Sequence, residues 1–432
     1  MDLLCNAYSN SSDEEPNPQP NQMHRPEPGT GYNAGVLPPY KRAKTNSTLF
    51  LRGEAPVPGR YVSKRERALL SQASPSSDQL TDQTTTQTIS ASQIVGSIID
   101  SDLPHNILSS LRQRKGCAQT SKLSERLFTT LYSHTKAVNA LSWSQDHAHL
   151  LASAGMDHTI LIWNVWNRDQ KIARVLRFHN SGVKDVKWCQ NGLSLLSCGY
   201  DCVSRLIDVE KGIETQSFKE DQFVGAIRFH PENSNLFLSG GSKGQIRLWD
   251  IRTRKVVHEY IRGLGPILDI EFTTNGKHFI SSSDVTGGNV SENSIVVWDV
   301  SRQVPLSNQV YVEAYTCPSI RCHPVDRCFV AQSNGNYIAI FSLSPPFRLD
   351  KYKRYESHGV SGFPIKCNFS LDGEKLVSGS SDGSIYFYDY KSSKLVRKIK
   401  AYEHPCIDVV FHPVMPNVIA ACSWNGEVSV FE

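Results

Sequence analysis

Hydrophobic and polar residues alternate in short runs beyond residue 122, and one run returns seven times. Its clearest copy, residues 150–165, has an apolar stretch, a polar turn centred on Asp157 and an alternating stretch that closes on the large aromatic Trp163. A hydrophobic period of two predicts half-buried β-strands, and the polar turn predicts a tight connection between them. Each copy therefore predicts at least two antiparallel strands.

The copies close at regular intervals of 42 to 49 residues. The closing residues are large and mostly aromatic: Trp163, Ile207, Trp249, Trp298, Phe341, Tyr388 and Phe431. A further apolar strand precedes each copy, as in VNALSW at 138–143 and VKDVKW at 183–188. A repeat of roughly 40 to 45 residues with several strands is typical of a β-propeller, in which each repeat forms one blade. We therefore predict an all-β fold, a seven-bladed β-propeller over residues 123–432.

The two ends of the repeat region predict how the ring closes. The sequence ends directly after the alternating strand of the seventh repeat, which leaves that repeat without a fourth strand of its own. An open sheet edge invites pairing with other chains. Residues 126–131 alternate and precede the first repeat, so we expect them to pair as the outer strand of the last blade.

The region before residue 123 has a different composition. It holds half of the 22 prolines, whereas all seven tryptophans follow it, and its charges are mixed. This composition predicts a largely disordered N-terminal region over residues 1–122. Ser11 and Ser12 stand before three acidic residues. This pattern fits either a target of an acid-directed kinase or a solvated, disordered N-terminal segment. The basic runs at 41–44 and 63–67 fit either nuclear import signals or solvated segments.

Two segments close this region. Residues 71–98 are rich in Ser, Thr and Gln and have no hydrophobic period, which predicts a linker. Residues 102–115 predict a short helix, because four apolar residues fall on one face. These are Leu103, Ile107, Leu108 and Leu111. The helix either docks a partner or lies on the side of the propeller, and the sequence does not separate the two.

Charge, cysteines and hydropathy narrow the class of function. The formal net charge of +4 is too small for a protein held on nucleic acid mainly by phosphate contacts, so direct nucleic-acid contact is not expected. The eleven cysteines include no CxxC pair, which favours a reducing compartment and no metal site. Apolar runs fall short of the ~18 residues that span a bilayer, so no membrane partner is expected.

No catalytic constellation is evident in the sequence. A GxSxG pattern occurs at residues 379–383, but a nucleophile elbow needs a strand that runs directly into a helix. Here the pattern falls between two predicted strands, at the turn of the repeat. We therefore predict a protein that is not an enzyme and that uses no cofactor or metal.

The turns of the repeats offer a candidate partner-binding surface. The residue before the turn acid is large and apolar in three repeats, as Trp424, Met156 and Tyr200. In repeats three to six we assign the position to Ser242, Ser283, Ser333 and Ser381. Repeats seven, one and two are consecutive in a closed ring, so the large residues form one sector. Aromatic and Met side chains on a surface are typical anchors of protein interfaces. The alternative is that each side chain folds over its own turn.

Polar residues at fixed spacing accompany the strands of the first two repeats. The first set is His134, Ser153, Asp157 and Trp163, and the second is His179, Ser197 and Asp201, with Ile207 in place of the tryptophan. They resemble the hydrogen-bonded tetrad of the WD-repeat family, in which Asp fixes His and His reaches through Ser to the indole. The resemblance implies a structural role for these residues.

The Trp-Asp endings, as in QIRLWDIR at 245–252, also resemble the WD-repeat family. The stretch 344–373 and the closing CSWNGEVSVFE at 422–432 are similar to the branch of WD repeat-containing protein 25 and pre-mRNA-processing factor 17, a second-step splicing factor. This resemblance implies a non-enzymatic, monomeric propeller within a larger complex, with spliceosomal proteins as partners. It implies a nuclear location, with the cytoplasm as the alternative.

A second interpretation rests on residues 248–252. Asp250 and Arg252 resemble the WDxR box by which some WD propellers dock on the adaptor of a cullin-RING ubiquitin ligase. The box here is Trp249, Asp250, Ile251 and Arg252. Under this interpretation the protein is a substrate receptor. Lys243 stands where the turn acid of that repeat is expected, which departs from the pattern.

Overall fold

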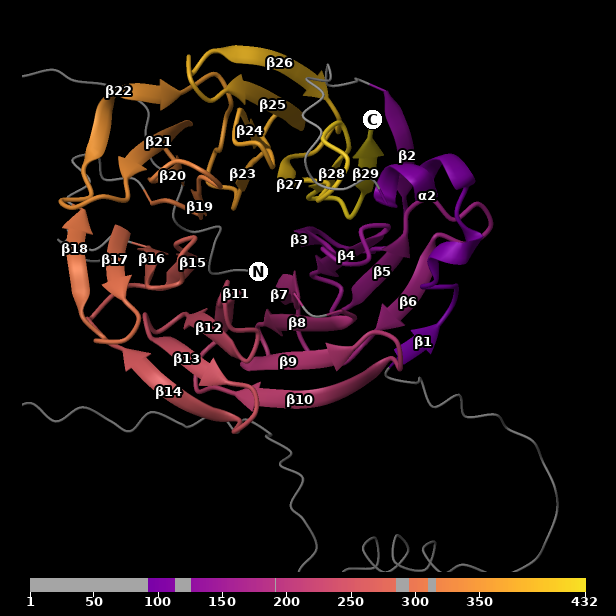
Figure 1. The fold of residues 1–432 in the computed structure, drawn as a ribbon, viewed down its shortest axis with the longest axis horizontal. Coiled ribbons are helices and arrows are strands. Elements are labelled where there is room, and N and C mark those ends of the chain that lie inside the picture. Colours follow the sequence, from indigo (N-terminus) through magenta and orange to yellow (C-terminus); the bar gives the residue numbers. More distant parts are fainter. Residues whose placement is uncertain (1–91, 113–125, 191, 285–294, 310–315) are drawn as a thin grey trace, which may run out of the picture. The chain divides into compact units, whose positions relative to one another are not determined.

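The computed structural model describes residues 92–112, 126–190, 192–284, 295–309 and 316–432. The chain divides into two compact units, Met1–Thr84 and Thr85–Glu432, and all described residues belong to the second. They form seven antiparallel sheets around a central channel, six with four strands and one with five (Figure 1). The predicted seven-bladed β-propeller is confirmed.

The blades follow the sequence, and each runs from an innermost to an outermost strand. Blade 1 contains β3 (Val138–Trp143), β4 (Leu150–Gly155), β5 (Ile160–Asn164) and β6 (Ile172–Leu176). Blade 2 contains β7 (Val183–Trp188), β8 (Ser194–Gly199), β9 (Val203–Asp208) and β10 (Ile213–Lys219). Blade 3 contains β11 (Val224–Phe229), β12 (Leu236–Gly241), β13 (Ile246–Asp250) and β14 (Lys255–Tyr260).

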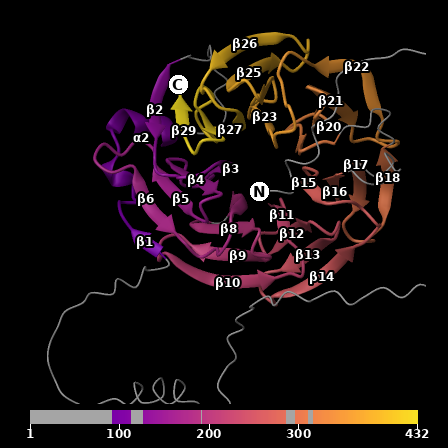
Figure 2. The same cartoon turned by 180° about the vertical axis from the view of Figure 1, so that it is seen from behind.

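The remaining blades continue round the ring, which Figure 2 shows from behind. Blade 4 contains β15 (Ile267–Phe272), β16 (His278–Ser283), β17 (Ile295–Asp299) and β18 (Pro305–Gln309). Blade 5 contains β19 (Ser319–Cys322), β20 (Cys328–Ser333), β21 (Tyr337–Ser342) and β22 (Leu349–Tyr355). Blade 6 contains β23 (Cys367–Phe369), β24 (Lys375–Ser378), β25 (Ser384–Asp389) and β26 (Leu395–Lys400). Blade 7 contains β27 (Cys406–Phe411), β28 (Ile419–Ser423), β29 (Val428–Phe431) and β2 (Leu127–Leu131).

The closing residue of every repeat lies on the third strand of its blade and is buried. Trp163 and Trp298 are among the largest side chains with almost no exposed surface. The hydrophobic clusters extend across blade boundaries, as in the cluster that joins Phe218 of blade 2 to Phe237 and Trp249 of blade 3. The core is therefore a series of apolar layers between blades, which requires a closed ring.

The ring is closed by the two ends of the repeat region. Strand β2, which precedes the first blade, pairs antiparallel with β29 and brings Leu127 opposite Phe431 (Figure 1). The backbone N–H of Glu432 also donates to the carbonyl of Arg126 at 3.0 Å. Blade 7 thus takes its outer strand from residues 126–131.

Three short elements before residue 123 also belong to the folded part, which corrects the start assigned to the propeller. Strand β1 (Ser92–Ile94) pairs with β6 as a fifth strand of blade 1. The prediction of a linker over 71–98 is therefore wrong for residues 92–94. This strand pairs through main-chain hydrogen bonds, and three residues are too few to show a hydrophobic period in the sequence. A 3-10 helix (Asp100–Asp102) and helix α2 (His105–Arg112) follow.

Helix α2 lies on the side of the propeller. Leu103 is buried, and Ile107, Leu108 and Leu111 pack against a cluster that contains Trp143 and Trp166. Of the two roles that the sequence left open for this helix, covering the propeller's own side is the one the structure describes. Residues 113–115 of the predicted helix lie outside the described residues.

Several features singled out in the sequence also lie outside the described residues. They include Ser11, Ser12 and the basic runs at 41–44 and 63–67. No disulfide joins any of the nine cysteines in the described ranges. No described helix has both the length and the apolar composition needed to span a bilayer.

Candidate functional site

The tetrad expected in blade 1 is a connected hydrogen-bond network. The Nδ1 atom of His134 lies 2.9 Å from an oxygen of Asp157, and its Nε2 lies 2.8 Å from the Ser153 hydroxyl. The indole N–H of Trp163 donates to the same hydroxyl at 2.9 Å. A carboxylate only accepts, so the Nδ1–H of His134 donates to Asp157. Every polar atom of this buried set has a partner, which suits a structural role.

Blade 2 repeats the network without the indole. His179 contacts Asp201 at 3.0 Å and the Ser197 hydroxyl at 2.8 Å. The fully buried Ile207 fills the position of the tryptophan. Arg205 adds an ion pair to Asp201 at 3.0 Å, so this network gains a charged contact where it lacks the indole hydrogen bond.

The other blades keep fragments of the network. Trp249 donates to Ser239 in blade 3 and Trp298 donates to Ser281 in blade 4, both at 2.9 Å. In blade 6, His358 lies 2.8 Å from the hydroxyl of Tyr388, the closing residue. The closing side chain is therefore anchored by a polar contact in these blades too.

Replacing Asp157 by Asn should remove a pH-dependent part of the stability. Burial raises the pKa of Asp157, but hydrogen bonds and charge from His134 outweigh it and lower the pKa from 3.8 to about 2. A folded pKa below the unfolded one contributes stability above pH ~4 that is lost as the pH falls towards 2. Asp157→Asn should cost about 2 kcal/mol at pH 7 and much less near pH 2. Denaturant unfolding at both pH values checks this, and an equal loss at both would contradict it.

Aspartates on three innermost strands connect neighbouring blades, an arrangement that the sequence analysis missed. Each buried carboxylate accepts a backbone N–H from the innermost strand of the next blade. The pairs are Asp408 with Leu141 at 3.1 Å, Asp185 with Ile227 at 3.4 Å and Asp269 with Ile320 at 2.9 Å. The available signal is an Asp at the same place in CIDVVF, VKDVKW and ILDIEF, inside otherwise apolar strands.

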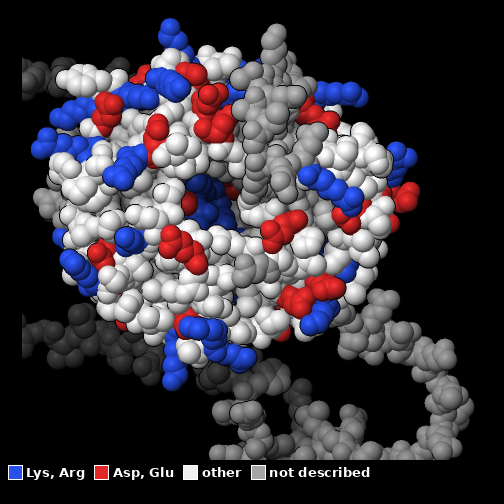
Figure 3. Space-filling model, viewed as in Figure 1, with Lys and Arg blue, Asp and Glu red and all other residues white. Residues whose placement is uncertain are grey.

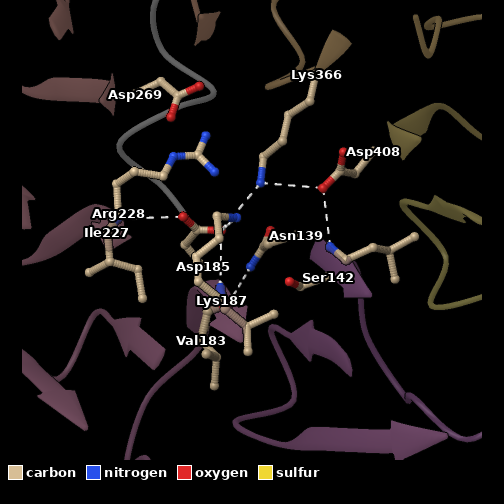
Figure 4. A network of polar contacts seen from close by, with 12 residues as sticks. Asn139, Ser142, Val183, Asp185, Lys187, Ile227, Arg228, Asp269, Lys366 and Asp408 are labelled. Carbon is tan, nitrogen blue, oxygen red and sulfur yellow. Dashed lines mark hydrogen bonds and ion pairs between the residues drawn. The ribbon is translucent and has the colours of Figure 1, made fainter. Parts of the chain in front are cut away.

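Basic side chains in the channel balance these carboxylates (Figure 4). Lys366 of the loop before β23 lies 3.5 Å from Asp408 and 3.7 Å from Asp185, which links three blades across the channel. Burial raises the pKa of Asp185, but Lys187, Lys366 and Arg228 outweigh it and hold that pKa well below its usual range. Figure 3 shows basic side chains at the bottom of the central hole. The charges hold the inner strands together.

Histidines at the ends of three innermost strands make a further set of connections between blades. In each, Nδ1 accepts backbone N–H groups of its own loop and Nε2–H donates to a carbonyl of the next blade. The pairs are His230 with Gly276 at 3.1 Å, His323 with Gly373 at 2.9 Å and His412 with Ala148 at 2.9 Å. Burial lowers the pKa of His412 to about 3, so this imidazole is neutral at pH 7.

The described residues provide no evident site for catalysis or a metal. Residues 379–383 form the turn between β24 and β25, so the GxSxG pattern is not followed by a helix. No group of three or more His, Cys, Asp or Glu within the described ranges could hold a metal ion.

Equivalent positions in the exposed turns are defined by one repeated hydrogen bond. In blades 1, 2 and 7 the backbone N–H groups of Met156, Tyr200 and Trp424 donate to the carbonyl of the loop before the innermost strand, at 2.8 to 3.1 Å. In blades 3 to 6 the same bond is made by Ser242, Asp284, Asn334 and Ser381. The assignment of Ser283 and Ser333 is therefore wrong by one residue, because both belong to the strands that end at these turns.

The large side chains at this face form ring pairs with two residues that the sequence analysis missed. Tyr200 lies 5.8 Å from Phe223 and Trp424 lies 5.4 Å from Phe363, measured between ring centroids. Tyr200, Phe223 and Trp424 are 39%, 50% and 41% exposed. Loops that precede neighbouring blades supply Phe223 and Phe363, so no feature of the repeat itself marks them.

Met156 contributes less than the rings. Its sulfur lies 2.8 Å from the position that a Cβ atom on Gly182 would take, so the side chain lies against the backbone at the start of blade 2. It is half-buried. We define the aromatic sector as Met156, Tyr200, Phe223, Phe363 and Trp424, on the turns and loops of blades 7, 1 and 2 and their neighbours.

The residues of the WDxR resemblance bind each other. Both carboxylate oxygens of Asp250 accept from the Arg252 guanidinium, at 3.2 and 2.9 Å, and one also accepts the Arg252 backbone N–H. The equivalent aspartates of blades 2, 4 and 6 cap the same turn: Asp208, Asp299 and Asp389. Turn capping thus accounts for Asp250, while the Arg252 side chain stays 66% exposed.

Comparisons with known proteins agree with this architecture. The family model "WD domain, G-beta repeat" matches residues 125–164, 170–208, 212–250 and 350–389. The chain is 35% identical to WD repeat-containing protein 25 of Mus musculus over 70% of its own length and 56% of that protein. It is 31% identical to pre-mRNA-processing factor 17 of Mus musculus over 69% of its length and 51% of that protein.

A more distant relative shows the same likeness. Pre-mRNA-processing factor 17 of Saccharomyces cerevisiae is 27% identical over 69% of this chain and 64% of that protein. The chain thus spans between half and two thirds of the length of these curated relatives. With its seven blades, the His–Asp–Ser–Trp network of blade 1 and these matches, the chain belongs to the WD-repeat family and is similar to WD repeat-containing protein 25 and pre-mRNA-processing factor 17.

Proposed function

We propose that the chain is a non-enzymatic protein-interaction scaffold in the nucleus, and that it associates with pre-mRNA splicing complexes through the aromatic sector. The observation that carries the docking role is the pair of ring contacts made by the exposed Tyr200 and Trp424, with Phe223 and Phe363 respectively. The splicing context comes from the similarity to pre-mRNA-processing factor 17.

Physical reasons favour a protein partner for this sector. Tyr and Trp bury large areas at low entropic cost and keep a polar atom for a hydrogen bond, so they dominate binding energy at interfaces. Their surface here is about two fifths exposed and therefore still to be buried. At the equivalent turn position the blades on the opposite side of the ring carry Ser242, Asp284, Asn334 and Ser381, so among the described residues the large side chains at this position come from blades 7, 1 and 2.

Replacing Tyr200 and Trp424 by Ser together should abolish partner binding without unfolding the propeller. Two ring anchors are removed from the interface, and such anchors cost about 2 kcal/mol or more each when lost. Because both side chains are partly exposed, the free energy of unfolding should change by less than about 1 kcal/mol. Quantitative comparison of the proteins that co-purify with tagged wild type and variant measures the first effect, and thermal unfolding measures the second.

A matched control lies at the other end of the strands. Val325, between β19 and β20, and Leu371, between β23 and β24, are exposed apolar residues of turns on the opposite face. Val325→Ser with Leu371→Ser should leave the co-purifying proteins unchanged. If the sector variant retains every partner, or if both variants lose the same partners, the aromatic sector is not the docking face.

The ubiquitin-ligase interpretation is an outcome of the same experiment. A receptor that docks through Arg252 would co-purify with a cullin-RING adaptor and lose it on Arg252→Ala, a change with little effect on stability because this guanidinium is exposed. We expect no such adaptor. Its presence without splicing proteins would replace the proposed function.

A further inference from the structure

The outer strand of blade 5 bulges away from its sheet and exposes an aromatic residue. Phe341 pairs with Leu349 and Ala339 pairs with Arg354, so four residues of β22 stand opposite a single residue of β21. These four residues are Asp350, Lys351, Tyr352 and Lys353. Tyr352 is fully exposed, at 101% of its reference surface. Bulges of this kind re-aim side chains and are frequent at functional sites.

The bulge lies against the turn between β25 and β26 of the next blade. The Nζ atom of Lys353 is 4.2 Å from the centroid of the Tyr390 ring, and the Tyr355 hydroxyl donates to the Tyr390 carbonyl at 2.9 Å. Lys391 and Lys394 follow Tyr390 in this turn. The two blades therefore present one continuous surface.

This surface is basic. Lys351, Lys353, Lys391 and Lys394 form no ion pair with any described residue. The nearby carboxylates of Asp350 and Asp389 accept backbone N–H groups of their own turns, and the charges of Lys391 and Lys353 also help to lower the pKa of Asp389. Four ammonium groups thus face these two carboxylates. Figure 3 shows Lys and Arg along the rim over β22 and β26. We define the basic rim as Lys351, Tyr352, Lys353, Lys391 and Lys394.

Protection of sheet edges does not account for the basic rim. Lysine on an outer strand discourages pairing with other chains, but such protection is needed on every blade. Strands β22 and β26 carry three Lys or Arg each, whereas β10 and β14 carry one each and β18 carries none. On β26 itself, Lys398 and Lys400 pair with Asp382 and Glu403, whereas Lys391 and Lys394 of the basic rim lie in the turn before this strand, away from its pairing edge. Edge protection therefore does not account for the positive charge of the rim.

We propose that the basic rim binds single-stranded RNA, with Tyr352 stacked on a base and the four lysines in contact with phosphates. Stacking on an exposed ring combined with a basic track is how single strands are held without sequence preference. An acidic protein would use the charge but leave a fully exposed ring between two lysines without a role. The choice of RNA over DNA rests on the proposed function.

Binding of the full-length chain to a fluorescently labelled twelve-nucleotide oligouridylate, followed by anisotropy at several salt concentrations, tests the proposal. The triple variant Lys351→Gln, Lys391→Gln, Lys394→Gln should bind more weakly, and the slope of log K against log salt should become shallower by about 2, because each lost phosphate contact on a single strand contributes about 0.7. Lys353 is kept because it packs on Tyr390.

The tyrosine has a different signature. Tyr352→Ala should weaken binding roughly tenfold and leave the salt slope unchanged, since stacking involves no counterion release. Tyr352→Phe should bind as the wild type does, because it keeps the ring. A wild type that does not bind the oligouridylate in 50 mM salt would overturn the proposal.

Controls separate the basic rim from other surfaces. Arg254→Gln with Lys255→Gln removes two exposed charges from the rim of blade 3 and should change nothing. The Tyr200→Ser, Trp424→Ser variant should bind RNA normally, so a failed docking face and a failed basic rim give different results. Equal weakening by the blade 3 control, full binding by Tyr352→Ala, or displacement of RNA by polyglutamate at equal charge would each overturn the proposal.

Discussion

A chain that ends at Gly426 is expected to lose cooperative folding altogether. The cut removes β29, whose Val428, Val430 and Phe431 are buried in blade 7. Burial of such side chains contributes about 1.5 to 3 kcal/mol each. Strand β2 pairs only with β29 in its sheet, so the cut also leaves it without a partner. The summed loss of about 5 to 9 kcal/mol is comparable to the total stability of many domains.

Circular dichroism with thermal unfolding measures this effect. A chain that lacks only Glu432 is the matched control, because it loses one backbone hydrogen bond and a contact to Trp166 while β29 stays intact. The control should retain a single transition close to that of the full chain. A chain ending at Gly426 that melts cooperatively within a few degrees of the full chain would show that the ring does not depend on this closure.

Asp408→Ala is expected to give the next largest loss, about 3 to 5 kcal/mol, which is typical when one partner of a buried ion pair is removed. Asp408 is 2% exposed, accepts the Leu141 backbone N–H and forms an ion pair with Lys366. The substitution leaves a buried N–H without an acceptor and leaves Lys366 with Asp185 alone, at 3.7 Å. The junction between blades 7 and 1 should weaken most.

Two further variants apportion this loss. Asp408→Asn keeps an oxygen for the Leu141 N–H but loses the charge, so its cost should lie between those of the wild type and Asp408→Ala. Asp146→Ala removes an exposed carboxylate near the same channel mouth and should change the free energy of unfolding by less than about 0.5 kcal/mol. Denaturant unfolding compares the three variants, and equal losses for Asp408→Ala and Asp146→Ala would contradict a bridging role.

The repeats made the fold predictable. A strand alternation that returns seven times specifies blades, and the closing aromatics mark the third strand of each, which the buried Trp163 and Trp298 occupy. The His–Asp–Ser set of blade 1 was expected from its resemblance to the tetrad of WD repeats, and its members are hydrogen-bonded to each other. Repeated local spacing was sufficient for the blades, whereas the network required the resemblance.

Contacts between blades and between distant segments were not predictable in this way. Phe223 and Phe363 join the aromatic sector from loops, where no period applies. The three residues of β1 pair through main-chain groups that any sequence possesses. The aspartates of the innermost strands are visible in the sequence as charged residues inside apolar strands. The reason for them appears only in the structure, where the next blade supplies the backbone N–H that each carboxylate accepts.

The overall charge balance concealed a local asymmetry. A net charge of +4 suggested little contact with nucleic acid, yet net charge does not report how charges are distributed over a surface. The four lysines of the basic rim come from two segments about 40 residues apart, 351–353 and 391–394, and the propeller brings them together. The net charge of the whole chain therefore does not reveal a local basic surface of this kind.

Purification of the tagged full-length chain from nuclear extract, with and without nuclease and followed by mass spectrometry, tests the proposed scaffold role most directly. Splicing proteins should remain bound after nuclease treatment, because the aromatic sector holds them by protein contacts. Loss of all splicing proteins with nuclease, or recovery of a cullin-RING adaptor in their place, would contradict it.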